Sequence, residues 1–168
     1  MRAILSWSFS AILFLGCAIA AAADKDKGES PQLEALKNRN KVPAAADIDT
    51  AVTLEALLAK TGPDAWPTDK GARLEGHVIQ VEQEEDGDMH IVLAAKGGET
   101  DTRKWVVVEA TPAWRKKNKH LSGSKLHELH GEKVQVLGWL FREPDADSHD
   151  PRGTLWELHP VVDLTVVK

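Results

Sequence analysis

Carboxylate and imidazole side chains recur in this sequence at a spacing of two residues, which places neighbours on one face of a β-strand. Asp88 is followed by His90, and Glu157 is followed by His159. Glu109 lies in a third segment, among branched aliphatic residues. Imidazole and carboxylate groups are the donors that zinc and similar divalent ions accept, and they also form general acid–base pairs. The sequence therefore offers a candidate binding site at Asp88, His90, Glu109, Glu157 and His159.

Three interpretations of these polar residues are open. In the first, they bind a ligand at the rim of the domain, and His149 joins them if the ligand is a metal ion. In the second, they are solvated and form cross-strand ion pairs on the outer surface. In the third, Glu157 and His159 hold the end of the domain by pairing with Arg152 or with the backbone. The metal ligands of the first interpretation are His90, Glu109, His149, Glu157 and His159.

The elements that must position these residues are five segments of strand-like alternation. They span residues 72–83, 88–95, 104–111, 132–141 and 154–167. The dipeptide Asp86-Gly87 joins the first two segments as a tight hairpin, because both turn residues tolerate positive φ. Helix signals, "TPAW" and "KLHELH", fall between the third and fourth segments. Three strands, a helical connection and two strands is the order of the OB-fold, so we expect a mainly β, five-stranded OB-like Greek-key barrel.

The last strand has one continuously apolar face. Every even position from Trp156 to Val166 holds an apolar residue. We therefore expect this face to be buried, with Trp156 in the core. Glu157 and His159 occupy odd positions, so we expect them to point away from the core toward the outer surface.

A short helix over residues 53–60 is predicted to precede the barrel. Thr53 is a suitable N-cap, and Leu54, Leu57 and Leu58 follow the spacing of one helix face. A helix this short is not stable alone. We therefore expect it to dock on the barrel, within a single domain that spans residues 47–168.

The first 46 residues read as export and tether segments. Residues 1–23 have the charged start, apolar run and small residues of a secretory signal peptide. Cys17, in "FLGC", offers the alternative of a lipoprotein held at a membrane. Residues 24–46 are polar and alanine-rich, which predicts a mostly disordered tether. A short helix over "PQLEALKN" is possible within it, but it has little to pack on. We expect an exported protein, periplasmic or extracellular, whose mature form has no cysteine and depends on a packed core.

The charge of the chain disfavours nucleic acid as a partner. The chain carries 26 acidic and 21 basic residues, with a formal net charge of −5, whereas cations that neutralise phosphates supply most of the affinity for nucleic acid. The run "WRKKNKH" at residues 114–120 is the best local case for a phosphate-binding patch, so Trp114 joins the candidate binding residues. The second and third strands offer only Trp105 as an aromatic platform.

Five motifs, in order, resemble a family of small exported bacterial proteins. They are "ARLEGHVIQV", "DGDMHIVLA", "VVVEATPAW", "VQVLGWLF" and "RGTLWELHP". Proteins of this family carry an OB-like domain that ends in a Trp-Glu-(Ile/Leu)-His-Pro segment, and the likeness runs from Val52 to the C-terminus. The resemblance implies the domain and its export but supplies no substrate. It also implies an Asp and a His in the loop before the last strand, here Asp145 or Asp147 with His149.

These observations predict an exported OB-like binding module with no catalytic role and no cofactor. Its ligand would be a small molecule, an oligosaccharide, an ion or another protein of the cell envelope. The alternative is a metal-dependent hydrolase, of nuclease type, that uses the His, Glu and Asp residues on the barrel rim with a divalent metal. The sequence contains no phosphate-binding loop, dinucleotide fingerprint or nucleophile elbow.

Overall fold

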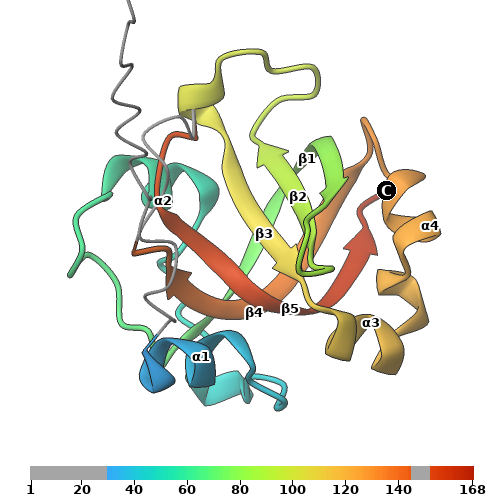
Figure 1. Cartoon of the computed structure of the whole chain (residues 1–168). Helices are drawn as coiled ribbons and strands as arrows, with labels where there is room; N and C mark the ends of the chain where they lie inside the picture. Colours follow the sequence, from blue (N-terminus) through green and yellow to red (C-terminus); the bar gives the residue numbers. More distant parts are fainter. Residues whose placement is uncertain (1–29, 145–151) are drawn as a thin grey trace, which may run out of the picture.

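The computed structural model describes residues 30–144 and 152–168, and Figure 1 shows its fold. The predicted signal peptide, the alternative lipidation at Cys17 and the loop residues Asp145, Asp147 and His149 lie outside these described residues. The described part of the chain consists of five strands joined by short helices and loops.

The five strands form a closed barrel (Figure 1). They are β1 (Gly71–Gln83), β2 (Met89–Ala94), β3 (Val106–Ala110), β4 (Lys133–Arg142) and β5 (Trp156–Val166). The order around the barrel is β1-β2-β3-β5-β4. β3 and β5 are parallel neighbours, whereas β4 pairs antiparallel with both β1 and β5. This arrangement confirms the predicted OB-like Greek-key barrel.

The hairpin between β1 and β2 turns at the predicted dipeptide. Gly87 has a φ of 92°, and its N–H donates to the carbonyl oxygen of Glu84 at 3.0 Å. Glycine adopts this conformation without the steric cost that a Cβ would add. The turn delivers Asp88 to the entrance of β2, two residues before His90.

Helix α2 (Leu54–Ala59) docks on the barrel as predicted. The hydroxyl of Thr53 accepts a hydrogen bond from the N–H of Ala56 at 3.1 Å, which caps the helix. Leu54 and Leu57 are buried against the barrel core. This packing is what stabilises a helix that is too short to persist alone.

The helical insertion between β3 and β4 is also present. It consists of α3 (Pro112–Lys117), the 3-10 helix η3 (Lys119–Leu121) and α4 (Gly123–His127). Leu121 and Leu126 are fully buried and fasten the insertion to the barrel. The helix predicted over "KLHELH" ends early, at the end of α4, and turn residues lead into β4. Across the described residues, no helix has the length and apolar character needed to cross a bilayer.

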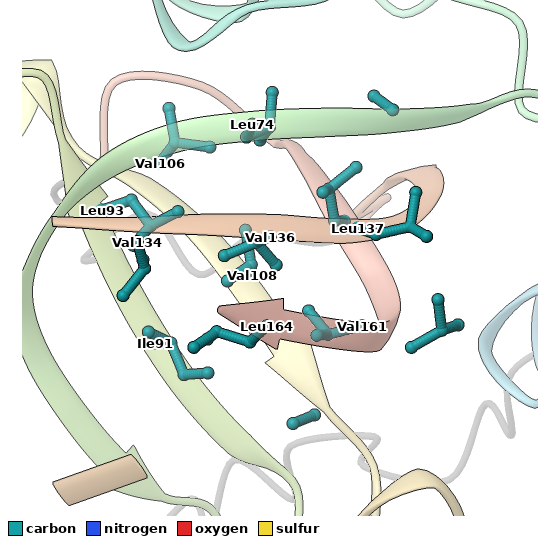
Figure 2. Close-up of a cluster of buried hydrophobic side chains, with 14 of the residues drawn as sticks. Leu74, Ile91, Leu93, Val106, Val108, Val134, Val136, Leu137, Val161 and Leu164 are labelled. Carbon is teal, nitrogen blue, oxygen red and sulfur yellow. The ribbon is translucent and has the colours of Figure 1, made fainter. Parts of the chain in front are cut away.

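Aliphatic side chains from the strands fill the barrel interior (Figure 2). Leu74 of β1, Ile91 of β2 and Val108 of β3 are completely buried, and Figure 2 shows Val108 near Val136 of β4 and Ile91 near Leu164 of β5. Trp156 is also completely buried, which confirms its predicted place in the core. Its indole N–H donates to the carbonyl oxygen of Gly62 at 2.8 Å, so the buried polar edge of the ring is satisfied.

The described part of the chain before the barrel contains the short helix that the sequence allowed within the tether predicted over residues 24–46. Residues 30–43, which we call the N-terminal strap, begin with helix α1 (Pro31–Lys37). The hydroxyl of Ser30 caps this helix. In Figure 1, α1 lies below β4 and β5.

Two tryptophans hold the strap by its backbone. The indole N–H of Trp114 donates to the carbonyl oxygen of Arg39 at 2.8 Å. The indole N–H of Trp139 donates to the carbonyl oxygen of Lys41 at 2.8 Å, and the guanidinium of Arg39 lies 4.8 Å from the centre of the Trp139 ring. Because these bonds use backbone carbonyls, the polar composition of the strap gave no sign of them.

Candidate functional site

The predicted polar residues meet on three neighbouring strands. Asp88 directly precedes β2 and His90 lies on it, Glu109 lies on β3, and Glu157 and His159 lie on β5. The antiparallel register of β2 and β3 sets His90 opposite Glu109. The parallel contact between β3 and β5 places Glu157 and His159 beside them. We call these five residues the acid–imidazole cluster.

Glu109 is the centre of the cluster. Its Oε1 lies 2.7 Å from Nε2 of His90, and its Oε2 lies 2.9 Å from Nδ1 of His159. The Glu109 side chain is 7% exposed. Hydrogen bonds between charged partners are shorter and stronger than neutral ones, and the one to His159 is shielded from water, since that side chain is 2% exposed. One carboxylate therefore orients both imidazole rings.

His159 faces three carboxylates. In addition to Glu109, its Nδ1 lies 3.3 Å from Oε1 of Glu157, and its Nε2 lies 3.4 Å from Oδ2 of Asp88. Its ring also lies 5.4 Å from the ring of Phe141, measured between centroids. Carboxylates on both ring nitrogens are the surroundings expected of an imidazolium cation, which donates from both nitrogens.

Glu157 is paired with Arg152 at the end of the loop before β5. Nη1 of Arg152 lies 2.7 Å from Oε2 of Glu157, and the two side chains are 7% and 0% exposed. This is the pairing that the structural interpretation of the "WELHP" segment predicts. A carboxylate at this depth needs a cation beside it, because a buried charge without a partner is strongly destabilising.

The burial of Glu157 and His159 contradicts the predicted exposure of both residues. They are 0% and 2% exposed, although they lie on the face of β5 opposite the predicted core face. The reason is that other segments of the chain pack over the outer face of β5 near Glu157 and His159. Arg152 contacts Glu157 and Phe141 contacts His159, while α1 also packs against β5. The positions are thus internal rather than on a solvated rim.

The packed charges shift the protonation of the cluster. Burial opposes a charge on His159, but the hydrogen bonds that its ring donates to Glu109 and Glu157 outweigh it and raise its pKa to about 10. Burial also opposes a charge on Glu109, yet its bonds to His159 and His90 hold its pKa well below the ordinary range. Burial raises the pKa of Glu157 and of Asp88. For His90, burial is outweighed by Glu109, and the pKa rises.

Two hollows reach the cluster. The outer-face hollow has a volume of about 220 Å³ and is lined by His90 and Trp105, among others. The strap hollow has a volume of about 550 Å³ and reaches Asp88 and His159, with Lys37 of the strap on its wall. The cluster is therefore buried but lies next to space that a ligand can enter.

Three members of the cluster can supply donor atoms to one cation. Asp88, Glu109 and His159 each offer one such atom, and these atoms all lie within 4.8 Å of one another. Two carboxylate oxygens and one imidazole nitrogen suit zinc and other first-row divalent ions. Glu157, which contacts His159, is placed to orient that ring, as residues around a metal site commonly do.

Of the other predicted site residues, His149 lies outside the described residues, and Trp114 does not join the cluster. Trp114 of α3 is buried and binds the strap, and the ammonium group of Lys117 lies 4.6 Å from its ring centre. Sequence reasoning missed Glu84, whose Oε1 lies 3.3 Å from Nδ1 of His90. Its place just before the hairpin turn was the signal that could have found it, because a hairpin returns the chain to that point.

The fold and the cluster together define a class: an OB-like barrel that carries a buried acid–imidazole cluster. The chain is similar to solved structures at low identity. For the Stn1-Ten1 complex of S. pombe, identity is 12% and the TM-score 0.38, with 58% of each chain covered. For a putative aspartyl-tRNA synthetase from Leishmania major Friedlin, identity is 13% and the TM-score 0.43, with 78% of this chain and 22% of that chain covered.

A DUF3299 family protein from Pseudomonas aeruginosa PAO1 shows 14% identity and a TM-score of 0.38, with 77% of this chain and 85% of that chain covered. The chain thus spans 58% and 22% of the first two structures it resembles. No protein-family model matches the sequence, and a search of curated proteins found no match. At these identities the likeness concerns the fold.

Proposed function

We propose that this protein is a binding module of the OB-like class and that its ligand is a divalent metal ion held by Asp88, Glu109 and His159. The observation that carries the proposal is that three buried donor atoms lie within 4.8 Å of one another. Three protein ligands with an open fourth position form a common kind of zinc site. The set contains no sulfur, which favours zinc or manganese over copper(I).

The charge of the cluster supports a divalent ion. When ionised, the carboxylates of Asp88, Glu109 and Glu157 carry three negative charges, and the guanidinium of Arg152 returns one positive charge. Two negative charges remain. A divalent ion with neutral imidazoles balances them, and without the ion two imidazolium rings balance them instead. The ion therefore replaces protons at the same buried site.

The strap hollow supplies a path for the ion. Asp88 lies on its wall, and the side chain of Asp88 is 11% exposed, whereas that of His159 is 2% exposed. An entry path is a requirement for any metal site that loads after folding. Asp88 is thus the ligand that a solvated ion meets first.

Metal content tests the proposal. The full chain, purified without an affinity tag and without chelator, is analysed by mass spectrometry together with Asp88→Asn and His127→Ala. Asp88→Asn removes one donor charge at constant size, and His127 is an exposed histidine of α4 that serves as the control. We expect stoichiometric metal in the parent and the control, and its loss in Asp88→Asn.

A thermal-shift measurement gives a second readout. Zn²⁺ or Mn²⁺ added to chelator-treated protein should raise the melting temperature, because ligand at a hundredfold excess over its Kd stabilises the fold by about 2.7 kcal/mol. Asp88→Asn should respond less than the parent. A parent protein that contains no metal and whose melting temperature does not move with either ion contradicts the proposal.

We infer that the module binds without catalysis, because the sequence carries no nucleophile motif and the cluster engages its own members in ion pairs. Hydrolysis of bis(4-nitrophenyl) phosphate by the metal-loaded protein tests this inference. No turnover is expected. Turnover that Glu109→Gln abolishes would replace the binding module by the metal-dependent hydrolase of the alternative interpretation.

We also propose that the protein is exported and that residues 1–23 are removed. The charged start and apolar run of this segment support export. Cell fractionation and N-terminal sequencing test it, with Asp24 as the expected first residue. A mature chain that begins at lipidated Cys17 would instead place the protein on a membrane, and an intact Met1 in the cytoplasmic fraction would contradict export.

A further inference from the structure

Strand register sets the floor of the outer-face hollow. Gln80 of β1 is paired with Val92 of β2, which is paired with Val107 of β3, so these residues form one row across three strands. The next row along the same face contains Glu82 and His90 as partners. Because residues two apart share a face of a strand, an apolar floor adjoins a polar edge.

Trp105 forms a wall of this hollow. It lies two residues before Val107 and therefore on the same side of the sheet. Its indole N–H donates to the carbonyl oxygen of Glu99 at 3.1 Å, and the residue is half-buried. The polar edge of the ring is thus fixed to the protein. An oriented aromatic ring beside a few polar groups is typical of a small-ligand site.

The charges around the hollow are unsuited to phosphate groups. Arg152 lines the hollow, but it pairs with the buried carboxylate of Glu157 at 2.7 Å. Both nitrogens of His90 face carboxylates, and Glu82 adds another carboxylate to the wall. Since nucleic acids bind through cations that neutralise phosphates, this hollow favours a neutral, polar ligand.

We propose that the outer-face hollow binds one ring of an oligosaccharide. The C–H face of the sugar would pack on the indole of Trp105 and on the apolar floor, and its hydroxyl groups would meet Gln80 and Glu82. The volume of about 220 Å³ suits one ring of a longer chain, since pockets for drug-sized ligands measure about 300–1,000 Å³. The inference does not rest on the proposed metal ion.

Titration of the full chain with tetrasaccharides tests this site. The probes are chitotetraose, maltotetraose and cellotetraose at millimolar concentration, and the readout is the NMR amide signals of Val92 and Val107. We expect at least one probe to shift these signals. Trp105→Ala should weaken its binding by about tenfold or more, as loss of one stacking platform does. Trp139→Ala, which removes a tryptophan that binds the strap, should not.

Gln80→Ala provides a second variant, because Gln80 is half-buried and its truncation leaves the barrel core intact. It should also weaken binding, and it carries the test if Trp105→Ala fails to fold. The absence of a shift with all three probes overturns the proposal, as does equal affinity in Gln80→Ala and the parent. A shift of Val92 and Val107 by oligothymidylate alone would assign the face to single-stranded nucleic acid. Chelator treatment should leave sugar binding unchanged, so failure here is distinct from failure of the metal proposal.

Discussion

The bridging carboxylate of Glu109 offers the sharpest test of the acid–imidazole cluster. Glu109→Gln keeps the size of the side chain but replaces a buried charge with a neutral amide. His90, at 2.7 Å, and His159, at 2.9 Å, then lose the carboxylate that they share. In metal-free protein we expect a large loss of stability, because removal of one partner from a buried ion pair costs about 3–5 kcal/mol.

Two features of the structure reduce this loss. The amide oxygen of the new side chain can still accept one hydrogen bond, worth about 1 kcal/mol. In addition, the negative charge of Glu109 raises the pKa values of Glu157 and Asp88, so its removal relieves repulsion inside the cluster. We therefore expect the free energy of unfolding to fall by about 2–3 kcal/mol at neutral pH. For a domain of this size, the melting temperature should fall by about 10 °C.

Urea unfolding of chelator-treated protein, followed by tryptophan fluorescence, measures the effect. Glu128→Gln is the matched control, because Glu128 forms its ion pair with Lys125 on the surface, where the side chains are 61% and 60% exposed. Exposed pairs contribute little, so the urea midpoint of the control should not change. A loss below about 1 kcal/mol in Glu109→Gln, within the range of ordinary substitutions, would refute the assignment of Glu109 as the shared carboxylate partner of the two imidazole rings.

Other perturbations test the titration of the cluster, the barrel and the strap. The pKa of His159 rises from 6.5 to about 10, so its contribution to stability is complete below pH 6.5 and is lost as the pH rises through about 10. The lowered pKa of Glu109 acts in the opposite sense: its contribution is present above its ordinary pKa of 4.5 and is lost in acid. Urea midpoints should therefore fall at both extremes of pH, and a flat alkaline limb would contradict the role of His159. Gly138→Ala should destabilise the barrel by about 2 kcal/mol, because a Cβ there would lie 2.9 Å from atoms of β5, whereas Gly62→Ala meets nothing within 4 Å and should be neutral. Trp114→Phe removes the 2.8 Å bond to the strap and should speed trypsin cleavage within residues 30–43, and an unchanged cleavage rate would show that other contacts hold the strap.

The barrel could be predicted from the sequence because the alternation of residues within each strand shows which of its faces is buried. Aliphatic residues at every second position, such as Ile91 and Val108, mark the inner face, and both are completely buried. The Asp86-Gly87 dipeptide marked the first hairpin, where Gly87 has a φ of 92°. These signals are local, so one sequence is enough to read them.

The depth of the cluster could not be predicted in the same way. Alternation shows which face of β5 a side chain occupies, but it does not show what lies over that face. Glu157 and His159 are covered by Arg152 and by Phe141 of β4, which come from different segments. Their burial depends on how the barrel and the loop before β5 pack together. The sequence of β5 alone does not show this packing.

The contacts that hold the strap on the barrel could not be predicted for a related reason. Its residues are polar, and its helix α1 buries no side chain. What orders it is the backbone, because two indole groups donate to its carbonyl oxygens. Amino-acid composition describes side chains only. A polar segment that is held through its main chain therefore has the composition of a disordered one.

The parallel contact between β3 and β5 also determines when the cluster can exist. Val108 and Leu158 are far apart in the sequence, and long-range pairings of this kind are slow to form. During synthesis on the ribosome, Asp88, His90 and Glu109 emerge well before Glu157 and His159. The complete set of charges assembles once β5 has been made and has docked, so a nascent or partly folded chain presents three of the five cluster residues on an unfinished sheet. Any ligand of the whole cluster would therefore recognise finished molecules and pass over incomplete ones.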